Sequence, residues 1–119
     1  MKLGIVGSRN YTDYVTFTSI MNNWISEYKP TIECIVSGGA KGVDSLAARY
    51  ASDNGIPLIV YEADWQQYGR SAGPKRNTLI ADSIDYLIAM PSKDSVGTWD
   101  TITKVRRLTK PVSIFTVGN

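Results

Sequence analysis

Short runs of apolar residues recur along the chain and predict five β-strands. Each run is rich in Ile, Val, Leu or aromatic residues and ends at a polar residue or a glycine. The runs span residues 2–6, 32–37, 57–63, 85–90 and 111–117. Continuous apolar runs, as opposed to alternating ones, are typical of strands that are buried on both faces. We therefore expect a sheet that helices cover on both sides.

Segments with the apolar spacing of helices lie between these runs. Apolar side chains recur at intervals of three and four residues over 17–28 and 43–51, and less regularly over 102–108. Strands that alternate with helices imply right-handed crossovers and a parallel sheet. The predicted fold class is α/β, a three-layer Rossmann-like domain with a five-stranded, mainly parallel sheet. The length of 119 residues corresponds to one such domain, residues 1–119.

The connection after the third predicted strand has a different character. Residues 64–73, DWQQYGRSAG, show no clear periodicity, and we expect either a surface excursion or part of a lid. Pro74 then fits the first turn of a helix. Lys75, Arg76 and Asn77 follow in that turn. Because cations at the start of a helix oppose its macrodipole, this placement indicates an anion close by.

The amino-acid composition excludes several kinds of catalytic and metal site. The chain has no histidine, which excludes Ser-His and Cys-His triads and histidine-ligated metal sites. Cys34 is the only cysteine, so no internal disulfide forms, and its apolar neighbours favour core packing over a reactive thiol. The formal charge of +2 is too small to indicate a nucleic-acid-binding face by itself. We expect neither a metal nor a cofactor.

The sequence also bears on location. No apolar run approaches the length of about 20 residues that a membrane span requires. Met1 and Lys2 lead directly into the first predicted strand, without the apolar stretch of a signal peptide. We therefore expect a cytoplasmic protein without a membrane partner.

Glycine, hydroxyl and basic residues gather in the loops that follow the predicted strands. Because the carboxyl ends of parallel strands meet at one edge, ligands of such sheets bind there, where the strand order reverses. The candidate ligand-binding residues are Gly7, Ser8 and Arg9 in the first loop, Ser37, Gly38, Gly39, Ala40 and Gly42 in the second, Arg70, Arg76 and Asn77 in the third, and Gly97 and Thr98 in the fourth. Together they predict a site for an anionic ligand.

The loop SGGAKG, residues 37–42, joins the second strand to a helix. Its glycines let backbone amides approach a phosphate, and the start of the helix adds a partial positive charge. The spacing fits neither a Walker loop nor G-x-G-x-x-G, and a tight turn with positive φ angles explains the glycines equally well. Asp44, in the first turn of the helix, either caps an amide or contacts a sugar hydroxyl.

Two arginines and three aromatic residues complete the set of candidates. Arg9 and Arg76 carry guanidinium groups, which match phosphate in bidentate geometry, although an exposed arginine needs no ligand. Trp65, Tyr68 and Trp99 lie in loops at the same edge. They either stack on a base or pack within a lid.

Four stretches together resemble the YspA-like Rossmann-fold proteins of the SLOG superfamily, which also holds the DprA (SMF) proteins and the lonely-guy phosphoribohydrolases. They are GSRNYTD, SGGAKGVDSLAARYA, ADWQQYGRSAGPKRN and VGTWD, in this order along essentially the whole chain. SGGAKGVD is similar to the S-G-x-A-x-G-[IV]-D stretch of the DprA group, and VGTWDT resembles the phosphate loop of the lonely-guy enzymes. The resemblance implies a small nucleotide-like ligand and a homodimer.

The resemblance covers a binding residue of the lonely-guy enzymes but not their catalytic residue. Arg76 falls on the arginine of the arginine-lysine motif of the lonely-guy enzymes, but their catalytic glutamate falls at Thr101, which cannot ionise. Asp100 is one position early and points about 100° away around a helix. Asp44 and Asp100 are therefore the only candidates for a catalytic carboxylate.

Three functions remain open at this point. The first is a module that senses or sequesters a nucleotide-derived ligand, held by loop amides of residues 38–42 and 97–98 and by arginines. The second is a nucleoside-monophosphate N-glycosidase, whose oxocarbenium-like intermediate needs a carboxylate. The third, implied by the DprA resemblance, is binding of single-stranded nucleic acid. Its candidate contacts, which also look like a solvated helix face, are Lys104, Arg106, Arg107 and Lys110.

Overall fold

A computed structural model describes residues 1–118 and contains one parallel sheet. The strands are β1 (Lys2–Gly7), β2 (Cys34–Ser37), β3 (Leu58–Val60), β4 (Tyr86–Met90) and β5 (Val112–Ile114). Their order is β3-β2-β1-β4-β5, and every neighbouring pair is parallel. The chain builds the sheet outward from β1 in one direction and then crosses to β4. The strand order therefore reverses between β1 and β4, which confirms the predicted Rossmann-like α/β fold.

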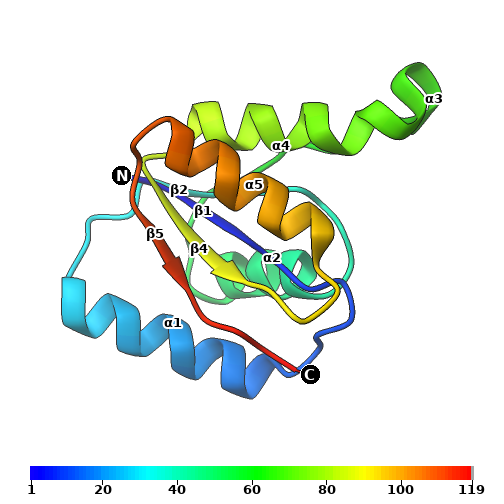
Figure 1. Ribbon diagram of the computed structural model, residues 1–119. Helices are drawn as coiled ribbons and strands as arrows, with labels where there is room; N and C mark the ends of the chain where they lie inside the picture. The colour runs from blue at the N-terminus through cyan, green and yellow to red at the C-terminus, as the bar shows by residue number, and fades with distance from the viewer. Residues whose placement is uncertain (119) are drawn as a thin grey trace.

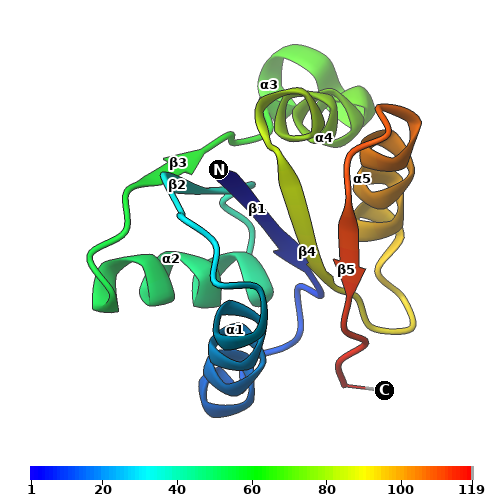
Figure 2. The same ribbon diagram turned by 90° about the vertical axis from the view of Figure 1, so that its left-hand side faces the viewer.

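Helices cover both faces of the sheet (Figures 1 and 2). One face carries α1 (Tyr14–Tyr28) and α2 (Val43–Asp53), and the other carries α4 (Ala72–Ser83) and α5 (Val96–Arg107). A short helix α3 (Trp65–Tyr68) and a 3-10 turn η1 (Gly69–Ser71) precede α4 and extend it away from the sheet (Figure 1). Within residues 1–118, no helix has the length and apolar character needed to cross a membrane.

The predicted helical spacing produces two apolar layers. Phe17, Met21 and Trp24 of α1 are buried together with the apolar face of α2. On the other face, Ile80 of α4 and Ile102 of α5 pack on the sheet. Cys34 belongs to this second layer, as its apolar neighbours predicted, and burial raises the pKa of its thiol. The layers leave the carboxyl ends of the strands open.

The outer strands differ from the prediction. β3 and β5 each contain three residues, where the sequence predicted 57–63 and 111–117. Leu58, Ile59 and Val60 are 37–40% exposed, so β3 is not buried on both faces. The reason is topological, because an edge strand has a partner on one side only and β2 itself is short.

The segment 64–73 is helical, although its sequence shows no period. The Asp64 carboxylate accepts a hydrogen bond from the Gln67 amide at 3.1 Å and caps α3. The chain then turns through η1 into α4, which begins at Ala72. Arg76 and Asn77 therefore lie beyond the first turn of α4, contrary to the prediction, and only Lys75 falls within that turn.

Candidate functional site

A cleft of about 400 Å³ opens where the strand order reverses, and we call it the inner cleft. Four loops or helix starts that follow β1, β2, β3 and β4 contribute to it. Its predicted lining residues are Gly7, Ser8, Arg9, Ala40, Asp44, Arg76, Asn77, Gly97 and Thr98. The structure thus brings most of the predicted site residues into one cavity.

A second, more open cleft adjoins the first, and we call it the outer cleft. Its volume is about 660 Å³. Gly38, Gly39, Lys41, Glu62 and Trp65 line it, and Arg9, Asn10, Ala40 and Arg76 belong to both clefts. Of the remaining candidates, Arg70 is exposed on η1, and Ser37 is buried with no hydrogen-bond partner for its hydroxyl within residues 1–118.

The loop 37–42 is organised by a carboxylate of the protein itself. Oδ2 of Asp44 accepts a hydrogen bond from the Ala40 amide at 3.0 Å. Asp44 is only 6% exposed, and burial raises its pKa, while the Ala40 amide and Arg76 act in the opposite direction. The Ala40 amide is thereby occupied. Asp44 thus caps the loop that precedes α2. The Ala40 amide is not available to a phosphate, which would need other hydrogen-bond donors.

Gly42 fixes the second loop against the first. It is the N-cap of α2 with φ +72°, a backbone conformation that favours glycine. A Cβ at Gly42 would collide with the backbone carbonyls of Ser8 and Arg9. The Val43 amide donates to the Ser8 carbonyl at 2.9 Å. The structural explanation for this glycine therefore holds, whatever the loop binds.

Arg76 joins α4 to the second loop. Its Nη1 donates to the Gly38 carbonyl, and its Nε donates to Oδ1 of Asn77 at 3.0 Å. Burial lowers the pKa of this guanidinium, and Asp44 opposes that effect. A Cβ at Gly38 would meet both Nη1 of Arg76 and Oδ2 of Asp44. These bonds hold the guanidinium at the boundary of the two clefts.

Arg9 approaches the same boundary from the first loop. Its side chain is exposed, and it forms no ion pair within residues 1–118. A guanidinium carries five N–H donors in a planar fork. Of the two arginines that line the clefts, Arg9 therefore has more donors available for a phosphate than Arg76 has.

The start of α5 presents backbone amides to the inner cleft. Ser95 is its N-cap but makes no side-chain cap, because its Oγ accepts instead from the Ser92 amide at 2.9 Å. Aspartates cap the starts of α1 and α3, whereas the starts of α2 and α4 also have no side-chain cap. The amides of Gly97 and Thr98 at an uncapped helix start suit an anion, because the helix dipole adds partial positive charge there.

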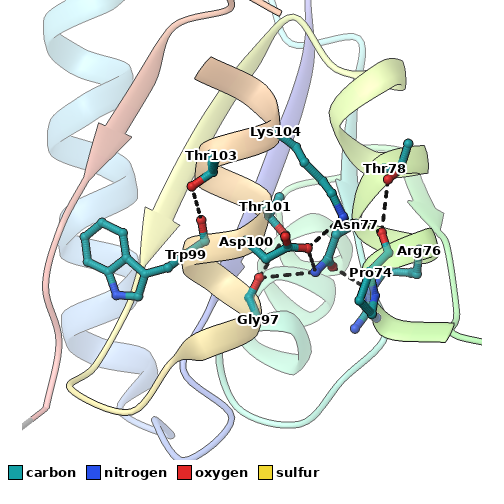
Figure 3. A network of polar contacts seen from close by, with 10 residues as sticks. All are labelled: Pro74, Arg76, Asn77, Thr78, Gly97, Trp99, Asp100, Thr101, Thr103 and Lys104. Carbon is teal, nitrogen blue, oxygen red and sulfur yellow. Dashed lines mark hydrogen bonds and ion pairs between the residues drawn. The ribbon is translucent and has the colours of Figure 1, made fainter. Parts of the chain in front are cut away.

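Asp100 faces α4 instead of the inner cleft (Figure 3). Its Oδ2 accepts from Lys104 Nζ at 2.8 Å and from Asn77 Nδ2 at 3.0 Å. Lys104 also donates to the Pro74 carbonyl at 2.7 Å. Although partial burial acts to raise it, these bonds hold the pKa of Asp100 below its usual value. Thr101, one position later, does line the cleft.

Sequence reasoning missed several polar residues of the inner cleft. Ser92 Oγ donates to Ser8 Oγ at 2.9 Å and lies 3.1 Å from Ser95 Oγ, so three hydroxyls form a chain along one wall. Asn10 belongs to both clefts. The available signal was the position of Ser92 and Ser95 in the segment that follows a buried strand, the same segment in which Gly97 was identified.

The comparisons with known proteins agree with this fold. The chain matches the YAcAr model, described as the YspA, cpYpsA-related SLOG family, over residues 1–68. It is 30% identical over 117 residues to the Gene 61 protein of Mycobacterium phage D29, covering 93% of each chain. The protein belongs to this YspA-related SLOG family, as the sequence resemblance predicted.

Solved structures with the same fold include two DNA processing proteins. DprA from Streptococcus pneumoniae superposes with a TM-score of 0.71 at 20% identity, over 99% of this chain and 50% of DprA. DprA from Helicobacter pylori gives 0.69 at 19% identity, over 96% of this chain and 64% of DprA. The present chain spans about half to two thirds of these proteins, and the likeness concerns the fold.

Proposed function

We propose that the protein binds a nucleotide or nucleotide-derived ligand in the inner cleft. The phosphate lies on the amides of Gly97 and Thr98 and within reach of Arg9 and Arg76. The observation that carries this proposal is the uncapped start of α5, which opens into the same cleft as two arginines. Helix starts offer backbone amides and a favourable dipole to a phosphate, and a guanidinium group can bind it in bidentate geometry.

The glycine at position 97 supports the same conclusion. A Cβ at Gly97 would meet no atom within 4 Å, so packing does not require a glycine there. Glycine inside a helix costs about 0.5–1 kcal/mol relative to alanine. Close approach of a ligand to the helix start explains why this position lacks a side chain.

Calorimetric titration with nucleoside monophosphates, nucleotide sugars and cyclic dinucleotides tests the proposal. Arg9→Ala should weaken the best ligand about ten- to a hundredfold, because a charge-assisted hydrogen bond contributes about 1.5–3 kcal/mol. Arg106→Ala removes the same charge from an exposed position of α5 outside both clefts and should change nothing. If the folded parent protein binds none of these ligands in calorimetry, the proposal is contradicted.

Cleavage of an N-glycosidic bond is a second candidate, and Asp44 is the observation that favours it. A buried carboxyl group with a raised pKa lines the inner cleft, where it can hydrogen-bond a ribose hydroxyl or protonate a leaving base. Release of free base from AMP or CMP, abolished by Asp44→Asn, would establish this activity. A protein that binds these nucleotides and releases no base over many hours is a binding module.

Single-stranded DNA binding is a third candidate, because the Helicobacter pylori DprA structure is described as showing a single-stranded DNA binding mode. Two of the four basic residues near the end of α5 make other contacts. Lys104 binds Asp100, and Lys110 Nζ donates to the carbonyls of Ala81 and Asp82. An oligonucleotide gel shift that weakens steeply with salt and is lost in Arg106→Ala would favour this function over the first.

Self-association is also part of the proposal. The edge strand β3 exposes Leu58, Ile59 and Val60 together with unpaired backbone groups, which is an arrangement that promotes pairing between chains. A symmetric pair of β3 strands would give a homodimer. Ile59→Lys should convert a dimer to a monomer in sedimentation velocity, and a parent protein that sediments as a monomer contradicts this part.

A further inference from the structure

The outer cleft offers the chemistry of a base-binding site. Trp65 is 53% exposed, and its ring edge lies against α4 at Gly73, where a Cβ would be 3.3 Å from the indole. The glycine therefore makes room for this position of the indole. An aromatic ring that is held along one edge and open to a cleft is a stacking surface for a base.

A carboxylate accompanies this ring. Glu62 follows β3 and packs across Gly39, where a Cβ would lie 3.1 Å from Cγ of Glu62. Its carboxylate can accept hydrogen bonds from an exocyclic amine or from ribose hydroxyls. The outer cleft thus combines a flat apolar surface with an acceptor, as a nucleoside requires.

The inner cleft has complementary chemistry. Among the described residues, no aromatic side chain lines it, so a base would find no stacking partner there. It offers instead the hydroxyls of Ser8, Ser92 and Ser95 and the carboxyl group of Asp44. Hydroxyls and carboxylates bind sugar hydroxyls, so this cavity suits a sugar.

The cations lie between these two environments. Arg9 and Arg76 line both clefts, and Gly97 at the start of α5 lines the inner one. Both volumes lie within the range of about 300–1,000 Å³ that holds a drug-sized ligand. A ligand that uses the whole site therefore has two uncharged ends and an anionic centre.

We infer that the ligand is a nucleoside diphosphate that carries a second sugar. Its base stacks on Trp65 in the outer cleft, its diphosphate lies along Arg9, Arg76 and the start of α5, and its second sugar occupies the inner cleft. This inference rests on the proposed function and specifies the class of ligand for the same site.

Two series of nucleotides test the inference by calorimetry with the parent protein. The first is AMP, ADP and ADP-ribose, and the second is UMP, UDP and UDP-glucose. In the series with the preferred base, affinity should rise about tenfold or more from monophosphate to diphosphate and again from diphosphate to the complete ligand, because each unit adds contacts in a further part of the site. A monophosphate that binds as tightly as the complete ligand in both series overturns the inference.

A pair of variants assigns the base to the outer cleft. Trp65→Ala should weaken the complete ligand about tenfold through lost stacking, and Trp65→Phe should restore most of the affinity. Tyr68→Ala is the matched control, because Tyr68 is 43% exposed in the same helix and lines neither cleft. Equal affinities for Trp65→Ala and Tyr68→Ala overturn the inference.

The two proposals fail in different ways. If no nucleotide of either series binds the folded parent protein, the proposed function is wrong and this inference is wrong with it. If a monophosphate binds, depends on Arg9, gains nothing from a second sugar and ignores Trp65→Ala, only the inference about the ligand class is wrong.

Discussion

Replacement of Gly42 by alanine tests how the glycine-rich loop is held. Gly42 has φ +72°, and a Cβ there would stand only 2.6 Å from the carbonyl oxygen of Arg9. Gly55 offers a matched control, because its φ is +64° and a Cβ would meet nothing within 4 Å. Both substitutions place a side chain at a positive φ, and only Gly42→Ala adds a collision between two loops of the site.

The structure sets the expected magnitudes. A non-glycine residue in a left-handed conformation costs about 1–2 kcal/mol, so Gly55→Ala should lose about that much stability. Overpacking adds typically 1–3 kcal/mol, and here the obstacle is backbone, which cannot rotate away as a side chain can. Gly42→Ala should therefore lose about 2–5 kcal/mol and weaken the Val43 to Ser8 hydrogen bond.

Urea denaturation with linear extrapolation measures both losses, and similar m-values confirm that the unfolded states are comparable. Ligand binding by Gly42→Ala should also fall, because Arg9 follows Ser8 directly. Equal stability losses in Gly42→Ala and Gly55→Ala would refute the described packing of the second loop against the first.

Three further substitutions separate fold from binding. Gly97→Ala should raise stability by about 0.5–1 kcal/mol in urea denaturation and lower nucleotide affinity at least about tenfold, and a variant that keeps its affinity contradicts the role of this helix start. Burial raises the pKa of Asp44 in the folded protein, so the folded state binds the carboxyl proton more tightly than the unfolded state does. The contribution of Asp44 to stability therefore falls as pH rises from about 4 toward neutral. Asp44→Asn should therefore gain stability over the parent across that range, and a constant difference between the two urea profiles refutes this. Asp100→Asn should lose about 0.5–1 kcal/mol at neutral pH, where the charge of Asp100 is bound by Lys104, and should leave nucleotide affinity within about twofold by calorimetry.

The sequence predicted the parts of the fold that depend on local pattern. The burial of Phe17, Met21 and Trp24 follows from their spacing, and the carboxyl edge follows from the order of strands and helices. Helix α3 was missed because four residues are too short to show a period, although Asp64 three residues before Gln67 is a capping signal.

The sequence predicted which loops form the site but not which residues contact one another within it. Arg9 was identified because it lies two residues after a buried strand, and Gly97 because glycine and hydroxyl residues recur in the segment that follows another. The sequence predicted amide capping as one of two roles for Asp44, but it did not identify Ala40 as the partner. The bond from Arg76 to Gly38 joins residues 38 apart in the chain, and no local pattern encodes it. Trp65 was predicted as a stacking candidate, but its position near Glu62 was not, because both residues approach the second loop only after β3 is in place.

Backbone amide chemical shifts recorded during titration with AMP and ADP-ribose test the central claim most directly, because they report where a ligand binds. The account predicts that the largest shifts occur at Ser8, Arg9, Gly97 and Thr98, with Glu62 and Trp65 affected as well by the complete ligand. Shifts confined to the end of α5 around Arg106, or to the groove between α1 and β5, would contradict a binding site at the carboxyl edge of the sheet.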